Sequence, residues 1–240
     1  MNILITGGAS GLVEAITKVL AKDINNTVYF TYSKSAEKAH KIEDEFANTV
    51  SVKCDFNNLE EVNSLAENIA SYGIDILVNN AYSGNPIKTY FHKNKIADFS
   101  EEFNANIVPT VILTQACINH FRKKKSGKII TILTSFLTNV HPTGASIYVA
   151  NKAYLKSLVN SWASENIKFN ITSNSVSPSF MQTNIANDVD ERVIEQIIES
   201  HPLKRLLTIE EVADSVLYLT KATTHLNGID ILINAGNNIK

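Results

Sequence analysis

The chain has 240 residues, of which 44% are hydrophobic and 19% charged, and its formal net charge is -2. This composition is that of an ordinary globular protein, and the near-neutral charge gives no reason to expect nucleic acid or an anionic membrane as a partner. No basic segment with a cleavage site opens the chain, and no apolar run approaches the roughly 20 residues of a membrane helix. We therefore expect a cytoplasmic protein.

Short β-branched runs alternate with segments of helical period along the whole chain. Strands are predicted at 2–6, 27–31, 50–54, 75–78, 128–133, 170–176 and 229–233. Amphipathic helices are predicted between them, among others at 36–47, 59–71 and 210–221. Continuously apolar strands such as 129–133 suit a parallel sheet buried on both faces. The pattern predicts an α/β fold, namely one doubly wound Rossmann-type domain over 1–240 with about seven parallel strands and helices on both faces.

Two segments interrupt this alternation, at 83–99 and at 177–206. The second carries a helical stretch of its own near 188–199. Long excursions in compact domains are usually functional loops. Both follow predicted strand ends, where ligands bind in open α/β sheets. We expect 177–206 to act as a substrate loop or lid.

The first strand runs directly into Thr6-Gly7-Gly8-Ala9-Ser10-Gly11-Leu12, which opens a helix. Glycines let a backbone approach a pyrophosphate closely, and a helix N-terminus supplies N–H donors to it. A simple tight turn is the alternative. The position at the first strand-to-helix junction favours dinucleotide binding by Gly7, Gly11 and Leu12.

The second predicted strand ends in Thr31-Tyr32-Ser33-Lys34 and lacks the acidic residue that would hold the 2′-hydroxyl of an NAD ribose. A carboxylate there would repel a 2′-phosphate, whereas Ser33 and Lys34 can bind one. NADP(H) is therefore favoured and NAD(H) remains an option. The alternative is that Lys34 is only a surface lysine.

Tyr148 and Lys152 lie four residues apart in a predicted helix, on one face of it. A lysine beside a tyrosine favours the phenolate and lowers the phenol pKa, which makes Tyr148 a usable proton donor to a carbonyl. Ser135 lies 13 residues earlier at the end of an apolar strand and can hydrogen-bond a substrate oxygen. A tyrosine and lysine at this spacing also occur by chance on helix surfaces.

Taken together, these motifs make the chain resemble the short-chain dehydrogenase/reductase family along its whole length, most closely its 3-oxoacyl-(acyl-carrier-protein) reductase group. The resemblance implies a catalytic set of Ser135, Tyr148, Lys152 and Asn106. It also implies cofactor contacts from Gly7, Gly11, Leu12, Ser33, Lys34, Asp55, Asn80, Ala81, Tyr148, Lys152, Pro178 and Thr183. Ser135 would orient the carbonyl, Tyr148 would give the proton, and Asn106 would hold a water that returns protons through Lys152.

The chain departs from the family pattern at several glycines. Val13 stands at the third glycine of the loop, where we expect it to push the helix outward and weaken pyrophosphate binding. Tyr82 follows Asn-Asn-Ala in place of a glycine, and we expect it to line the cleft and restrict substrate bulk. Phe180 is the second candidate substrate residue. Other departures are at Pro109, Ser179, Asn234 and Ala235.

Three functions are compatible with the sequence. The first is an NAD(P)(H)-dependent carbonyl reductase or alcohol dehydrogenase, the second a non-catalytic NAD(P)-binding sensor or scaffold, and the third a nucleotide-sugar epimerase or dehydratase. The retained Ser135, Tyr148 and Lys152 favour the first, because a sensor needs no proton donor. Its partners would be a small carbonyl or alcohol substrate and further copies of the chain, in a homodimer or homotetramer. Six scattered histidines show no ligand spacing, so no metal is expected.

Overall fold

The computed structural model describes residues 1–7, 9, 11–82, 89–181 and 190–237. Seven strands form one sheet in the order β3-β2-β1-β4-β5-β6-β7, and every pairing between neighbours is parallel. The strands are β1 (Asn2–Ile5), β2 (Thr27–Tyr32), β3 (Thr49–Lys53), β4 (Ile76–Asn79), β5 (Gly127–Ile132), β6 (Ile171–Pro178) and β7 (Asp230–Ile233). The predicted parallel, doubly wound α/β fold is confirmed.

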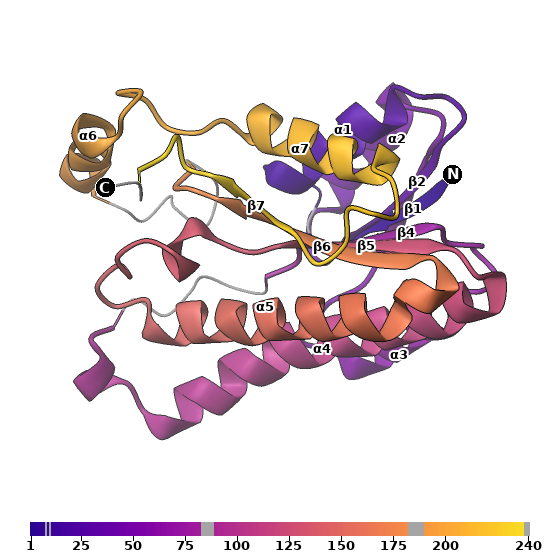
Figure 1. Cartoon of the computed structure of the whole chain (residues 1–240), viewed down its shortest axis with the longest axis horizontal. Helices are drawn as coiled ribbons and strands as arrows, with labels where there is room; N and C mark the ends of the chain where they lie inside the picture. Colours follow the sequence, from indigo (N-terminus) through magenta and orange to yellow (C-terminus); the bar gives the residue numbers. More distant parts are fainter. Residues whose placement is uncertain (8, 10, 83–88, 182–189, 238–240) are drawn as a thin grey trace.

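Helices cover both faces of this sheet, with α1, α2 and α7 on one side and α3, α4 and α5 on the other (Figure 1). Their bounds are α1 (Leu12–Ala21), α2 (Ala36–Glu45), α3 (Leu59–Asn68), α4 (Ile96–Lys124), α5 (Ser146–Asn166), α6 (Glu191–Ser200) and α7 (Ile209–Lys221). Three short 3-10 helices are η1 (Phe91–Lys93), η2 (Ser135–Leu137) and η3 (Ile167–Phe169). Among the described helices, none is long and apolar enough to cross a membrane.

Successive side chains of a strand point to opposite faces of the sheet, so each strand contributes to the hydrophobic cores on both faces. Ile3 and Ile5 pack into the core beneath α1 and α7, while Leu4 between them packs into the core with Leu113 and Phe121 of α4. All of these side chains are fully buried. A strand buried on both faces favours apolar side chains at successive positions, as at Ile3, Leu4 and Ile5 of β1, although the fully buried β6 also carries serine, threonine and asparagine.

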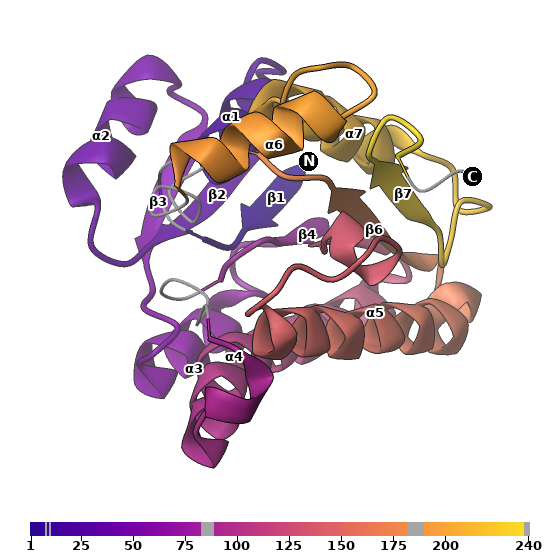
Figure 2. The ribbon, with the colours of Figure 1, turned by 90° about the vertical axis from the view of Figure 1, so that its left-hand side faces the viewer.

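Strand order reverses between β1 and β4, because β2 and β3 extend the sheet on one side and β4 to β7 on the other. In open α/β sheets, ligands bind at the carboxyl edge at such a reversal, because the loops after the two strands leave in opposite directions. Figure 2 looks onto this edge, with α6 lying across it on the side of α1 and α7. Candidate site residues from β1, β2, β4, β5 and β6 all lie at this edge.

In the predicted loop at 83–99, residues 91–93 form the short helix η1 and the last four residues belong to helix α4. Helix α4 begins at Ile96, where Asp98 accepts a hydrogen bond from the Lys95 backbone in a capping box. Capping satisfies backbone donors that a helix start otherwise leaves without partners, so it fixes where the helix begins. In the described part of 177–206, helix α6 starts at Glu191, capped by Asp190.

Candidate active site

The loop after β1 turns sharply at Gly7, which has a φ of 131°. The Thr31 hydroxyl at the end of β2 accepts from Gly7 N (2.9 Å) and donates to Gly7 O (3.2 Å), which fastens the turn. A Cβ on Gly7 would lie 2.7 Å from Val13 Cγ2 and 2.8 Å from Asn80 Nδ2. Glycine is therefore required here by both backbone conformation and space.

Val13 is 3% exposed and belongs to the core cluster beneath α1. Its methyl group uses the space that the missing side chain of Gly7 leaves open. The structure thus accommodates the valine by packing; a weaker affinity for pyrophosphate remains a prediction.

The N-terminus of α1 fits an anionic group. Gly11 precedes the helix at its N-cap position and has no side chain with which to cap the backbone N–H groups of the first turn. A Cβ on Gly11 would meet no atom within 4 Å, so the space beside it is open. Backbone donors beside open space, at the positive end of the helix dipole starting at Leu12, are the groups that could hold a phosphate or pyrophosphate.

Thr6 connects the ends of β1 and β4. Its hydroxyl accepts hydrogen bonds from Asn80 N (3.1 Å) and Ala81 N (3.3 Å). This tie holds the segment that leaves β4 beside Gly7. Asn80 and Ala81 therefore lie next to the glycine turn that follows β1. The backbone continues from them to Tyr82.

Ser33, Lys34 and Asp55 lie together at the ends of β2 and β3. Backbone and side-chain hydrogen bonds from Asn57 and a side-chain hydrogen bond from Ser33 lower the pKa of Asp55, and the charge of Lys34 adds to this. The side chain of Lys34 is exposed. Its ammonium is thus the positive charge available to a ligand at this position.

Tyr148 and Lys152 share one face of α5, beneath the carboxyl end of β5. The Lys152 ammonium is buried, donates to the carbonyl of Ile132 (2.8 Å) and lies 5.8 Å from the centroid of the Tyr148 ring. Burial lowers the pKa of Lys152 to about 8. Burial also raises the pKa of Tyr148 to about 12, and a hydrogen bond with the Thr134 hydroxyl offsets part of that rise.

The pKa of Tyr148 therefore moves in the direction opposite to the one expected from the sequence. Desolvation penalises the phenolate more than the ammonium of Lys152 favours it, because that ammonium is directed at a backbone carbonyl. At neutral pH, Tyr148 is a phenol with a proton to give.

Ser135 is 1% exposed, and its hydroxyl has no hydrogen-bond partner among the described residues. The preceding residue, Thr134, contributes the hydroxyl that contacts Tyr148. Thr134 also caps η2, where it accepts from Phe136 N. Two neighbouring hydroxyls thus lie at this strand end. The sequence motif predicted a catalytic role only for that of Ser135.

Asn106 is buried in α4, and its side-chain amide donates to the backbone carbonyl of Glu102 one turn earlier (3.0 Å). Glu102 is 9% exposed, and its carboxylate accepts from the hydroxyl of Tyr82 (2.5 Å). The Tyr82 ring packs edge-on against the Tyr148 ring with centroids 5.1 Å apart. Tyr82 therefore lies directly beside the candidate proton donor.

The remaining predicted residues come from the end of β6. Pro178 is the last residue of that strand and is buried, and Phe180 follows at intermediate exposure. Thr183 lies outside the described residues.

Comparison of the sequence with known proteins identifies the family. A family profile described as Enoyl-(Acyl carrier protein) reductase matches residues 7–238. The 3-oxoacyl-(acyl-carrier-protein) reductase FabG of Aquifex aeolicus is 32% identical over 97% of this chain and 95% of its own length.

The chain belongs to the short-chain dehydrogenase/reductase family.

Solved structures lead to the same family. A short chain dehydrogenase from Burkholderia cenocepacia in complex with NADP superposes with a TM-score of 0.85 at 26% identity, covering 98% of this chain and 97% of that one. A structure described as a putative betaketoacyl-ACP reductase also gives 0.85 at 27% identity, covering 100% and 98%. This short-chain dehydrogenase/reductase is an NAD(P)-dependent oxidoreductase, and the comparisons do not support the non-catalytic alternative.

Two residues of this short-chain dehydrogenase/reductase escaped the sequence analysis. Thr134 precedes the serine expected from the family motif, and a hydroxyl residue at that strand end was the available signal. Glu102 lies one helical turn before Asn106, but a glutamate in an amphipathic helix gives no sign that it is buried.

Replacing Thr134 by valine should lower kcat/KM about tenfold or more, and at least as much as Ser135→Ala, because the Thr134 hydroxyl hydrogen-bonds to Tyr148, whereas that of Ser135 has no partner among the described residues. The phenol pKa of Tyr148 should also rise, since the Thr134 hydrogen bond lowers it. Steady-state kinetics and ultraviolet titration of the phenol test both effects. If Thr134→Val kept wild-type kinetics while Ser135→Ala did not, Ser135 would be the orienting hydroxyl.

Proposed function

We propose that this enzyme uses NADPH to reduce the carbonyl of a 3-oxoacyl thioester or a closely related substrate. The observation that carries the proposal is the buried cluster of Tyr148, Lys152 and the Thr134–Ser135 hydroxyls at the carboxyl edge of the sheet. Its similarity over 97% of the chain to a 3-oxoacyl-(acyl-carrier-protein) reductase supports the substrate class.

The residues divide the reaction between them. When bound, NADPH supplies the hydride to the carbonyl carbon. The hydroxyls of Thr134 and Ser135 orient the carbonyl oxygen, and Tyr148 donates the proton that this oxygen needs as it gains charge. Lys152 places a positive charge beside the phenol and favours proton release from it. Asn106 holds the water through which the proton is replaced.

The cofactor would bind along the edge from β3 to β5. Gly7, Gly11 and Leu12 would hold the pyrophosphate at the N-terminus of α1, and Asp55 would lie at the adenine. Asn80 and Ala81 would follow the chain towards the ribose held by Tyr148 and Lys152. Pro178 and Thr183 would complete the nicotinamide end.

Segment 177–206 would cover the substrate. None of the residues of α6 is fully buried, yet Ile194, Ile197 and Ile198 are partly covered and Val193 is exposed. These side chains form an apolar surface for a hydrocarbon chain, which Phe180 would extend. Tyr82 would limit the bulk admitted near the carbonyl.

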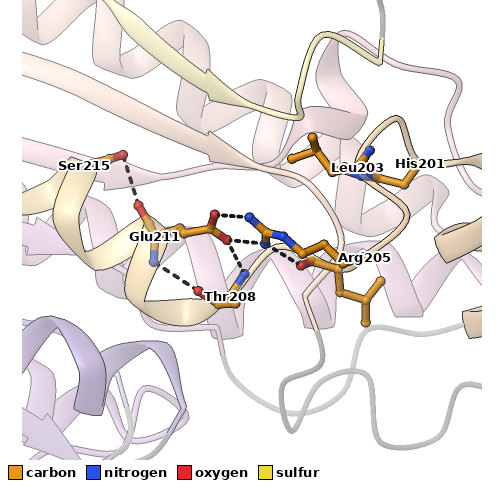
Figure 3. A network of polar contacts seen from close by, with 7 residues as sticks. His201, Leu203, Arg205, Thr208, Glu211 and Ser215 are labelled. Carbon is orange, nitrogen blue, oxygen red and sulfur yellow. Dashed lines mark hydrogen bonds and ion pairs between the residues drawn. The ribbon is translucent and has the colours of Figure 1, made fainter.

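The far end of this segment is fastened to α7, as Figure 3 shows. The Arg205 guanidinium donates to both carboxylate oxygens of Glu211, at 2.6 and 2.9 Å, and holds the pKa of that carboxyl at about 2. Glu211 also accepts from Thr208 N, and Thr208 Oγ1 accepts from Glu211 N. These bonds would anchor the C-terminal side of the lid to α7.

A homodimer or homotetramer would use α4 and α5. Tyr154 is 46% exposed and packs on Phe103 across the two helices, and Leu158 and Val111 lie partly covered nearby. By contrast, Leu155 is buried in the core, so only part of this face of α5 could contact another subunit.

Substrate screening tests the proposal. NADPH oxidation should be observed with a 3-oxoacyl thioester and be weak or absent with keto-sugars. Turnover of keto-sugars alone would replace the proposed substrate class, and NADPH binding without turnover of any carbonyl would contradict the reaction.

NADPH should bind more tightly than NADH, because Lys34 offers an exposed cation and no carboxylate ends β2. The Lys34→Ala variant should weaken NADPH binding about tenfold and leave NADH binding nearly unchanged, as expected for one charge-assisted hydrogen bond. Fluorescence titration measures both constants, with Lys41→Ala on exposed α2 as the control. Equal or tighter binding of NADH to the wild type would refute the preference.

A further inference from the structure

Glu102 is a buried carboxylate that the reaction described above does not use. It lies on α4 one turn before Asn106, 9% exposed, and its Oε2 accepts from the Tyr82 hydroxyl at 2.5 Å. A buried carboxylate is costly unless it is hydrogen-bonded, and a hydrogen bond from a phenol to a carboxylate is charge-assisted. Burial and the Glu102 charge raise the pKa of Tyr82, so Tyr82 keeps the proton that it donates.

The ring of Tyr82 lies between this carboxylate and the ammonium of Lys152. Lys152 Nζ is 5.4 Å from the Tyr82 ring centroid and 5.8 Å from that of Tyr148. Both distances are within the roughly 6 Å over which an aromatic ring attracts a cation. The ammonium is therefore in contact with two aromatic rings.

Lys152 needs such support because it is 4% exposed. In the described part of the chain its ammonium donates to the Ile132 carbonyl and forms no salt bridge with a carboxylate. A desolvated ammonium without a counter-ion readily loses its proton. A group that favours the charged form keeps Lys152 protonated. In that form its positive charge favours proton release from Tyr148.

We propose that Glu102 and Tyr82 form a positioning pair that keeps the Lys152 ammonium charged beside Tyr148. The carboxylate fixes the Tyr82 ring by holding its hydroxyl, and its negative charge makes the ring a better acceptor for a cation. The expected effect of the pair on catalysis rests on the proposed carbonyl reduction. Its expected effect on the charge of Lys152 does not. The groups that contact the ammonium are the Ile132 carbonyl of β5, the Tyr82 ring after β4 and the Tyr148 ring on α5, and Glu102 of α4 acts on it through Tyr82.

The first test measures the pKa of Lys152 directly. In enzyme labelled at the lysine Cε, the NMR signal lost in Lys152→Met identifies the residue, and its pH titration needs no substrate. In Glu102→Gln and in Tyr82→Leu the pKa of Lys152 should fall by about half a pH unit or more. Tyr82→Phe keeps the ring without the carboxylate bond, so its effect should be smaller.

The matched control is Glu101→Gln, which changes the exposed neighbour on the same helix and should leave the pKa of Lys152 unchanged. Melting curves show which variants fold, and if Glu102→Gln does not, the two Tyr82 variants decide the test. An unaltered pKa of Lys152 in the folded variants would mean that the pair only fills space, and would overturn the proposal.

The second test follows the same variants in catalysis. The alkaline limb of the kcat/KM profile for reduction should move to lower pH in Glu102→Gln, because Lys152 then loses its proton earlier as pH rises. A uniform loss of activity at all pH values would indicate a structural role instead. If no carbonyl is turned over by the wild type, the proposed function fails, while the NMR titration still decides the role of the pair.

Discussion

Replacing Tyr148 by phenylalanine should lower kcat by about 10²- to 10⁴-fold while leaving cofactor binding and the melting temperature close to wild type. The phenol pKa of about 12 means that Tyr148 carries its proton throughout the neutral range, so the loss reflects removal of the donor. Its ring packs against Tyr82, and phenylalanine retains that contact. Steady-state NADPH oxidation across pH gives the rate.

The control for this variant is Tyr154→Phe on the same helix. Tyr154 is exposed and packs on Phe103, away from Lys152, so removing its hydroxyl should leave kcat unchanged. Near wild-type turnover in Tyr148→Phe on a confirmed substrate would show that another group donates the proton.

Replacing Gly7 by alanine should destabilise the fold and abolish measurable NADPH binding. The added Cβ would be placed 2.7 Å from the Val13 side chain and 2.8 Å from Asn80, at a φ of 131° that L-residues rarely adopt. Backbone strain costs about 1–3 kcal/mol, and overpacking costs a similar amount. The melting temperature should fall by about 2–4 °C for each kcal/mol lost.

Gly73→Ala is the matched control for this second variant. Gly73 also has a positive φ, of 60°, but its added Cβ would be 3.4 Å from the nearest side-chain atom and far from the loop after β1. It should lose some stability and bind NADPH normally. Calorimetry and fluorescence titration measure both effects. Wild-type NADPH affinity in Gly7→Ala would show that this loop does not hold the pyrophosphate.

Much of the fold is encoded locally. Continuous apolar runs predicted the buried central strands, and each predicted strand was found within about two residues of its position. The predicted helix starts at 36, 59 and 210 lie within one residue of those of α2, α3 and α7, whereas α2 and α3 end two and three residues before their predicted ends. The predicted loop at 83–99 was partly wrong, because α4 begins at Ile96, where Asp98 completes a capping box.

The sequence by itself determined the parallel doubly wound sheet, the glycine turn after β1 and the spacing of Tyr148 and Lys152, because each depends on neighbouring residues or on a fixed period. Only the tertiary structure decided the environment of those side chains. It showed Thr134 at Tyr148, and it brought Glu102 from α4 and Tyr82 from the end of β4 to Lys152 on α5. It also reversed the expected direction of the Tyr148 pKa. Burial and long-range contacts arise only when distant segments pack, and they outweigh a charge four residues away.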